Sequence, residues 1–103
     1  MPVRDFVDEV LCVPITRIGS RYITEAIEIV LDTHDIKFYP RLVAMTHINA
    51  RQLEKSIRDA RLLSLRYMSS EERVNIFGEG TPNNSEYILK ATEYYRRKYA
   101  NKD

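Results

Sequence analysis

The stretch YPRLVAMTHINARQLEKSIRDARLLSLRY, residues 39–67, predicts a short helix, a tight turn and a long helix. Pro40 suits the first turn of a helix over 40–46, because its missing N–H would have no intrahelical partner there. The residues 46–48 then form the turn. Three residues give the short helix its apolar side: Leu42, Val43 and Met45.

The long helix over 49–67 has two different faces. Asn49 can cap its start, and Gln52 follows at the spacing of a capping box. Five residues recur every three or four positions and form a face suited to burial: Leu53, Ile57, Ala60, Ser64 and Tyr67. Five others share the opposite, mostly cationic face: Arg51, Lys55, Arg58, Leu62 and Arg66.

This pattern is typical of a helix-turn-helix, in which a supporting helix holds a second helix whose outer face enters the major groove of DNA. Val43, Ile48 and Leu53 have the spacing of apolar residues that lock such a pair together. The outer positions hold residue types that can bond to base edges: Arg51, Gln52, Glu54, Lys55 and Arg58. The solvated face of an ordinary helical bundle would give the same pattern.

Composition limits the other classes of function. A chain of 103 residues, 44% of them hydrophobic, is predicted to form one domain over 1–103. Its one cysteine, Cys12, is expected to be a core residue, and no Cys/His spacing suggests a metal site or a cofactor. No apolar run is long enough for a membrane span and no signal peptide is evident, so we expect a cytoplasmic protein without membrane contact.

Charge is divided unevenly along the chain, although the net charge is only +1. Residues 1–36 hold three arginines against seven carboxylates, a balance of −4. Residues 37–103 hold thirteen lysines or arginines against eight carboxylates, a balance of +5. Such asymmetry can orient a protein on a polyanion, with the acidic half facing away.

The rest of the chain also has helical periodicity and no strand-like alternation. Further helices are predicted over 3–12, 20–32, 69–77 and 84–99. Ser20, Ser69 and Asn83 are expected to cap three of them. Residues 101–103 are expected to fray. The predicted fold class is therefore all-α, with about six helices around a helix-turn-helix and no sheet.

Three motifs in this order resemble a known family. They are Val13-Pro14 with Gly19 and the 25–27 segment Glu-Ala-Ile, the segment 39–78, and Pro-Asn-Asn-Ser-Glu-Tyr-Ile at 82–88. Over nearly the whole chain, this pattern is similar to the C-terminal DNA-binding domain of the sporulation response regulator, stage-zero sporulation protein A. The resemblance implies a helix-turn-helix effector domain, of the response-regulator type or the wider winged-helix superfamily. Such domains bind short duplex sites, usually as tandem copies, and activate or repress transcription.

The resemblance also implies roles for residues. Glu54 and Lys55 match a Glu-Arg pair that faces bases, and the change to Lys loses the planar fork that reads guanine bidentately. Arg58 matches an arginine of the family, whereas Arg51 and Gln52 stand where the family commonly has Ser and Arg. The family's receiver domain has no counterpart in this chain, so we expect no control through a receiver of its own.

Two functions remain open at this point. The first is a sequence-specific DNA-binding regulator of transcription in sporulation, bound to double-stranded DNA as tandem copies or as a homodimer. Weaker candidates for phosphate contacts are Arg41, His47, Arg61 and Lys98. The second is a module that pairs with a full-length regulator of the family and antagonises it; RNA polymerase is a further candidate partner. No catalytic constellation is recognisable, so we expect no enzyme.

Overall fold

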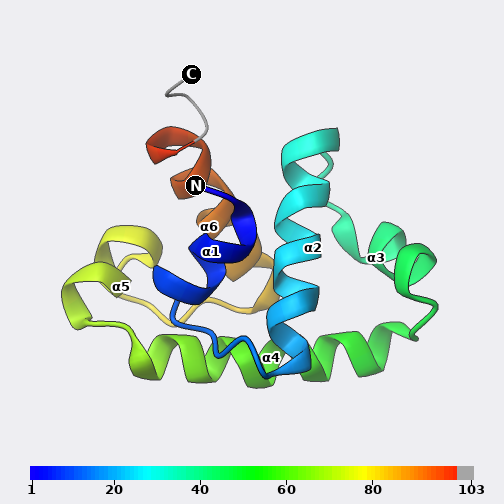
Figure 1. Cartoon of the computed structure of the whole chain (residues 1–103), viewed down its shortest axis with the longest axis horizontal. Helices are drawn as coiled ribbons and strands as arrows, with labels where there is room; N and C mark the ends of the chain where they lie inside the picture. Colours follow the sequence, from blue (N-terminus) through cyan, green and yellow to red (C-terminus); the bar gives the residue numbers. More distant parts are fainter. Residues whose placement is uncertain (100–103) are drawn as a thin grey trace.

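Six helices make up all the regular secondary structure in the part of the chain that the computed structural model describes, residues 1–99. They are α1 (Val3–Glu9), α2 (Ile18–Thr33), α3 (Phe38–Thr46), α4 (Ala50–Tyr67), α5 (Ser70–Phe77) and α6 (Asn84–Lys98). In Figure 1, α4 lies along one edge of the molecule and the other five helices lie on one side of it. The predicted all-α fold is confirmed. The predicted fraying of 101–103 concerns residues outside the described part.

α2 is the central helix, since it packs against α1, α3, α4 and α6. Its buried apolar side chains are Tyr22, Ile23, Ala26, Ile27, Ile29 and Val30, and Leu31 is half-buried. The crossing with α4 is very close at Gly19, where a Cβ atom would lie 2.4 Å from the carbonyl oxygen of Ser56 and 2.6 Å from the Cβ of Ala60. A glycine is therefore required for α2 to seat on α4.

The first helix is shorter than predicted. α1 ends at Glu9, and the N–H groups of Val10 and Leu11 both donate to the carbonyl oxygen of Phe6. Cys12 adopts a left-handed conformation, with φ of 58°, and is only half-buried. The prediction that Cys12 is a core residue was wrong, because the chain turns there to bury its two neighbours.

Two helix starts also differ from prediction. α2 begins at Ile18, so Ser20 lies inside the helix, buried, instead of capping it. α3 begins at Phe38, two residues before Pro40, and Phe38 is almost fully buried. Since Pro40 still falls among the first four residues, its missing N–H removes no helical hydrogen bond.

The buried face of α4 ends differently from the predicted one. Leu53, Ile57, Ala60 and Ser64 are buried as predicted, but Tyr67 is 58% exposed. Leu65 and Met68 contribute the last buried side chains instead. Met68 ends α4 in an extended conformation with φ of −69°, which any residue can adopt. On α3, Met45 is likewise 57% exposed, so it was wrongly assigned to the apolar side.

The predicted caps of the last three helices are present. Asn49, Ser69 and Asn83 each accept a hydrogen bond from the backbone N–H three residues further on. Only Asn83 forms the reciprocal capping box, in which its N–H donates to Glu86. These local bonds fix where α4, α5 and α6 begin.

A buried polar chain joins α6 and α4 to the segment that follows α1. The hydroxyl of Tyr87 donates to Ser64 Oγ at 2.6 Å, and Ser64 Oγ donates to the carbonyl oxygen of Leu11 at 2.6 Å. Tyr87 and Ser64 are both fully buried. Burial raises the pKa of Tyr87 well above its usual value near 10, because the phenolate would lose its hydration.

Candidate nucleic-acid interface

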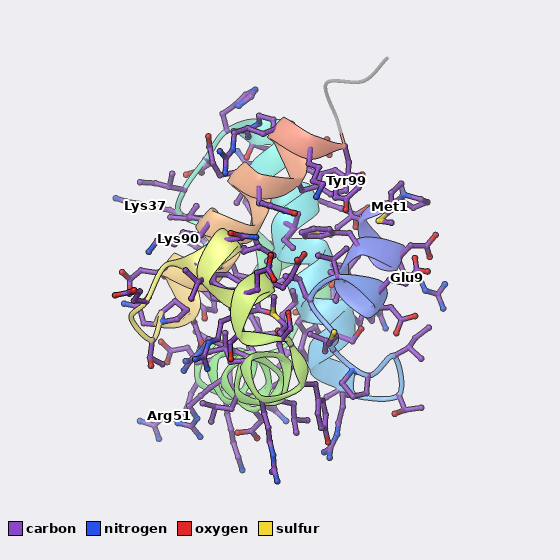
Figure 2. The ribbon with its side chains drawn as sticks, turned by 90° about the vertical axis from the view of Figure 1, so that its left-hand side faces the viewer. Met1, Glu9, Lys37, Arg51, Lys90 and Tyr99 are labelled. Carbon is purple, nitrogen blue, oxygen red and sulfur yellow. The ribbon has the colours of Figure 1, made fainter. Side chains whose placement is uncertain are left out.

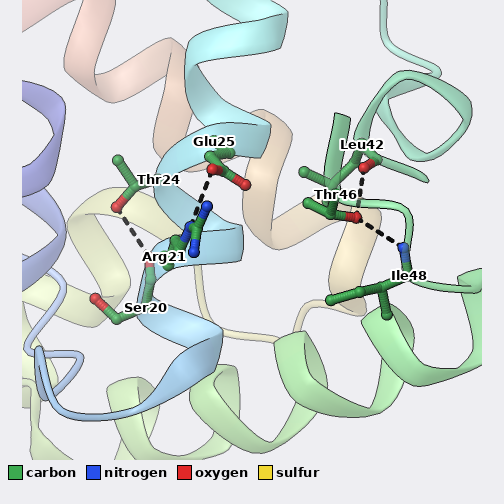
Figure 3. A network of polar contacts seen from close by, with 7 residues as sticks. All are labelled: Ser20, Arg21, Thr24, Glu25, Leu42, Thr46 and Ile48. Atoms are coloured by element: carbon green, nitrogen blue, oxygen red, sulfur yellow. Dashed lines mark hydrogen bonds and ion pairs between the residues drawn. The ribbon is translucent and has the colours of Figure 1, made fainter. Parts of the chain in front are cut away.

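The connection between α3 and α4 is fixed by its own hydrogen bonds. Thr46 Oγ1 donates to the carbonyl oxygen of Leu42 at 2.8 Å and accepts from the N–H of Ile48 at 3.3 Å (Figure 3). Asn49 then caps α4 through the N–H of Gln52 at 2.9 Å. Three residues, 47–49, therefore connect the two helices, and side chains at both ends hold the chain path.

His47 supplies the left-handed residue that ends α3. Its φ and ψ are 59° and 25°, and its N–H donates to the carbonyl oxygen of Val43. Glycine is the usual residue in this conformation at a helix end, because it carries no Cβ. Histidine is among the residues that adopt the conformation at modest cost. The turn therefore has the backbone of a glycine-containing turn without the glycine.

Apolar contacts hold the two helices together as predicted. Leu53 is fully buried, while Val43 and Ile48 are half-buried and pack against the core. The same core includes the buried residues Phe38 and Leu42 from α3. Because both helices are anchored in one core, the outer face of α4 has a fixed direction relative to the rest of the molecule.

The five predicted base-reading residues are all exposed on α4: Arg51, Gln52, Glu54, Lys55 and Arg58. Figure 2 shows α4 end-on at the base of the molecule, with Arg51 pointing away from the body. Among these five, the described ion pairs involve only Arg58, whose Nε lies 3.8 Å from the carboxylate of its neighbour Asp59. The other charges on this face are free to meet a partner.

The four weaker candidates for phosphate contacts lie in different parts of the molecule. Arg41 is exposed on α3 and its Nε lies 3.6 Å from Asp35. His47 is exposed in the turn, beside the start of α4. Lys98 lies at the end of α6, on the side of the molecule away from α4 (Figure 1). Its Nζ donates to the Tyr94 hydroxyl at 2.9 Å, and this bond raises the pKa of Lys98.

Arg61, the fourth candidate for a phosphate contact, uses its guanidinium for hydrogen bonds within the protein. Its Nε donates to Asn84 Oδ1 at 2.8 Å and its Nη1 donates to the carbonyl oxygen of Pro82 at 2.7 Å. Asn84 Nδ2 in turn donates to the carbonyl oxygen of Glu54 at 3.0 Å and to the Tyr39 hydroxyl at 3.2 Å. Burial raises the pKa of Tyr39, an effect that the hydrogen bond from Asn84 and the charge of Arg61 partly offset.

The sequence analysis did not identify Asn84 and Tyr39 as parts of this region. The one available signal was the pair Asn83-Asn84, since a helix start needs only one capping amide. With Arg58 and Ser85, these two residues line an open hollow of about 420 Å³ between α3, α4 and the start of α6. The base-reading candidates Glu54 and Arg58 are thus part of the lining of this hollow.

The acidic part of the chain lies mainly on α1 and α2, on the other side of α4 from its outer face (Figure 1). On α2, Glu28 and Asp32 are exposed. Glu25 is mostly buried, with Oε1 accepting from Arg21 Nε at 3.2 Å (Figure 3). The carboxylates of α1 and α2 therefore lie away from the outer face of α4, and the cations at the end of α6 lie on that side too.

Within residues 1–99, no three His, Cys, Asp or Glu side chains are grouped so that they could bind a metal ion. No helix of this part combines the length and apolar character needed to cross a bilayer. Comparison with known protein families and with curated proteins finds no match to this chain.

Proposed function

We propose that this protein is a sequence-specific DNA-binding regulator of transcription that places α4 in the major groove. The observation that carries the proposal is the outer face of α4, which is exposed, mostly cationic and directed away from the body by the α3–α4 turn. A role in sporulation follows only from the resemblance to the regulator family.

The dimensions of α4 suit a groove. Its 18 residues extend over about 27 Å at 1.5 Å per residue. A helix with side chains is about 10–12 Å across, close to the major groove width of about 12 Å. The first half of α4 holds the base-reading candidates, and a recognition helix contacts base edges mainly through its N-terminal residues.

The electrostatics support the same orientation. The exposed residues of α4 include four cations, at positions 51, 55, 58 and 66, against two carboxylates, at 54 and 59. Arg41 and His47 lie on the neighbouring helix and turn, where phosphates would flank the groove. The carboxylates of α1 and α2 lie away from this face, so these two helices would disfavour contact with DNA.

A protein partner is the second candidate, because the second half of α4 is partly apolar on its exposed side. Leu62 is 51% exposed and Tyr67 is 58% exposed. This surface could pair with a full-length regulator of the resembled family and block its assembly on DNA. Binding of such a regulator without DNA, abolished by Leu62→Ser but not by Lys55→Ala, would favour this function.

Selection from a random duplex library followed by fluorescence anisotropy tests the DNA-binding proposal. The enriched duplex should bind at least about 10³-fold more tightly than its scrambled counterpart. If three or four phosphates are contacted, log K should fall with log salt with a slope of about −3 to −4. Absence of any enriched sequence, together with equal binding to all duplexes, would refute sequence-specific recognition.

A further inference from the structure

We infer that Asn84 is a positioning residue for DNA recognition: it ties the start of α6 to the backbone of the recognition helix and sets the direction of the base-reading side chains. This inference rests on the proposed function. Asn84 is the first residue of α6, yet its side chain contacts α3 and α4 instead of capping its own helix.

The bond to α4 reaches the backbone in the middle of the base-reading segment. Asn84 Nδ2 donates to the carbonyl oxygen of Glu54, so this carbonyl has a partner from outside its helix. A bond to the main chain fixes the helix itself, whereas a bond to a side chain would fix only one rotamer. Glu54 and Lys55 extend from this same turn of α4.

Further bonds hold Asn84 in that orientation. Its Oδ1 accepts from Arg61 Nε at 2.8 Å, and Arg61 is anchored to the carbonyl oxygen of Pro82 at 2.7 Å. Nδ2 also donates to Tyr39, which connects the group to α3. The separate capping of α6 by Asn83 leaves the Asn84 amide available for these contacts. These hydrogen bonds thus link both α3 and α4 to the start of α6.

This arrangement explains a difference between Arg61 and the other cations of α4. The Arg61 guanidinium is half-buried and turned toward α6, whereas Arg51, Lys55 and Arg58 are exposed. Its charge therefore strengthens the bond to Asn84, since hydrogen bonds with an ionised donor are stronger than neutral ones. Arg61 supports Asn84, and Asn84 supports the helix that reads the bases.

Two variants separate the contributions of Asn84. Asn84→Ala removes all of its side-chain bonds. Asn84→Asp keeps an oxygen for Arg61 and places a negative charge favourably at a helix start, but it loses the donor to Glu54 and Tyr39. Ser69→Ala is the matched control, because it removes one polar cap at α5, away from the hollow.

The test measures binding of each variant to the enriched and scrambled duplexes at equal salt. Both Asn84 variants should lose about tenfold in preference for the enriched duplex, as expected for the loss of two hydrogen bonds that position the reader. Binding to the scrambled duplex should change equally little for Asn84→Ala and Ser69→Ala. In the free protein, amide hydrogen exchange over 54–58 should accelerate only in the Asn84 variants.

Each outcome has a distinct meaning. A wild-type protein without sequence preference would overturn the proposed function, and with it this role of Asn84. A wild-type preference that survives unchanged in both Asn84 variants would overturn the inference alone. Loss of preference in Asn84→Ala but not in Asn84→Asp would also overturn it, because the Arg61 contact would then suffice. An equal loss of preference in Ser69→Ala would show that the effect is general destabilisation, and it would overturn the inference.

Discussion

Replacement of Gly19 by Ala tests the seating of α2 on α4, on which the direction of α4, the proposed recognition helix, depends. The new methyl group would lie 2.4 Å from the Ser56 carbonyl oxygen and 2.6 Å from the Ala60 Cβ, whereas ordinary contact begins at 3.4 Å. One obstacle is backbone and the other is a Cβ atom, so neither can rotate away. The two helices must therefore separate by up to about 1 Å, the shortfall in the first distance.

The magnitude follows from two opposing effects. Overpacking of this kind costs about 1–3 kcal/mol. Alanine has a better helix propensity than glycine by up to about 1 kcal/mol, and the gain is smaller here because Gly19 is the second residue of α2. The net expectation is a loss of about 1–2 kcal/mol in the free energy of unfolding, which lowers Tm by about 4–8 °C per kcal/mol for a domain of this size.

Urea unfolding followed by circular dichroism measures this loss directly. Gly80→Ala is the matched control, because a Cβ at Gly80 would meet nothing within 4 Å. That variant should be neutral or slightly stabilised. A Gly19→Ala protein as stable as the wild type would refute the close crossing of α2 and α4, and with it the argument for a rigidly held recognition helix.

Three further predictions concern the core, the turn and the groove face. Tyr87→Phe should cost about 0.5–1.5 kcal/mol in urea unfolding at neutral pH, since the hydrogen bond to Ser64 is lost. Because the pKa of Tyr87 is raised in the folded state, wild-type stability should fall as pH rises above the usual tyrosine value near 10, and a Tyr87→Phe protein that loses stability just as steeply would contradict this. His47→Gly should increase the free energy of unfolding by up to about 1 kcal/mol and so raise Tm, because glycine adopts the left-handed backbone conformation of residue 47 without strain. An unchanged or lower Tm would argue against this conformation in the turn. Lys55→Ala should cost about 1–3 kcal/mol on the enriched duplex and relax one base preference, whereas an equal loss on scrambled DNA would reduce Lys55 to a phosphate contact.

Local signals in the sequence predicted the helices well. Periodicity and capping residues together located all six, and the polar residues Asn49, Ser69 and Asn83 marked three starts where the structure has capping bonds. These features depend on neighbours within one or two turns of the chain. The signals failed where packing between helices decides: Phe38 extends α3 backwards because its ring is buried in the core, and Tyr67 is exposed although its spacing matched the buried face.

In the candidate site, too, features set by neighbouring residues could be predicted, whereas contacts between helices could not. Exposure of Arg51, Gln52 and Lys55 followed from their helical spacing alone. The partners of Arg61 did not, because Pro82 and Asn84 lie more than twenty residues further along the chain. The sequence does not distinguish the half-buried Arg61 from the exposed Arg58. They differ because α6 packs beside α4, so that Asn84 and Pro82 accept hydrogen bonds from Arg61 alone of the two.

An NMR titration shows whether the outer face of α4 binds DNA. Backbone amide signals of the protein labelled with nitrogen-15 would be followed while the enriched duplex is added. We expect the largest shifts over 49–58, smaller shifts at His47 and Arg41, and almost none at the end of α6 around Lys98. Shifts concentrated on α1 and α2, with α4 unaffected, would contradict the account.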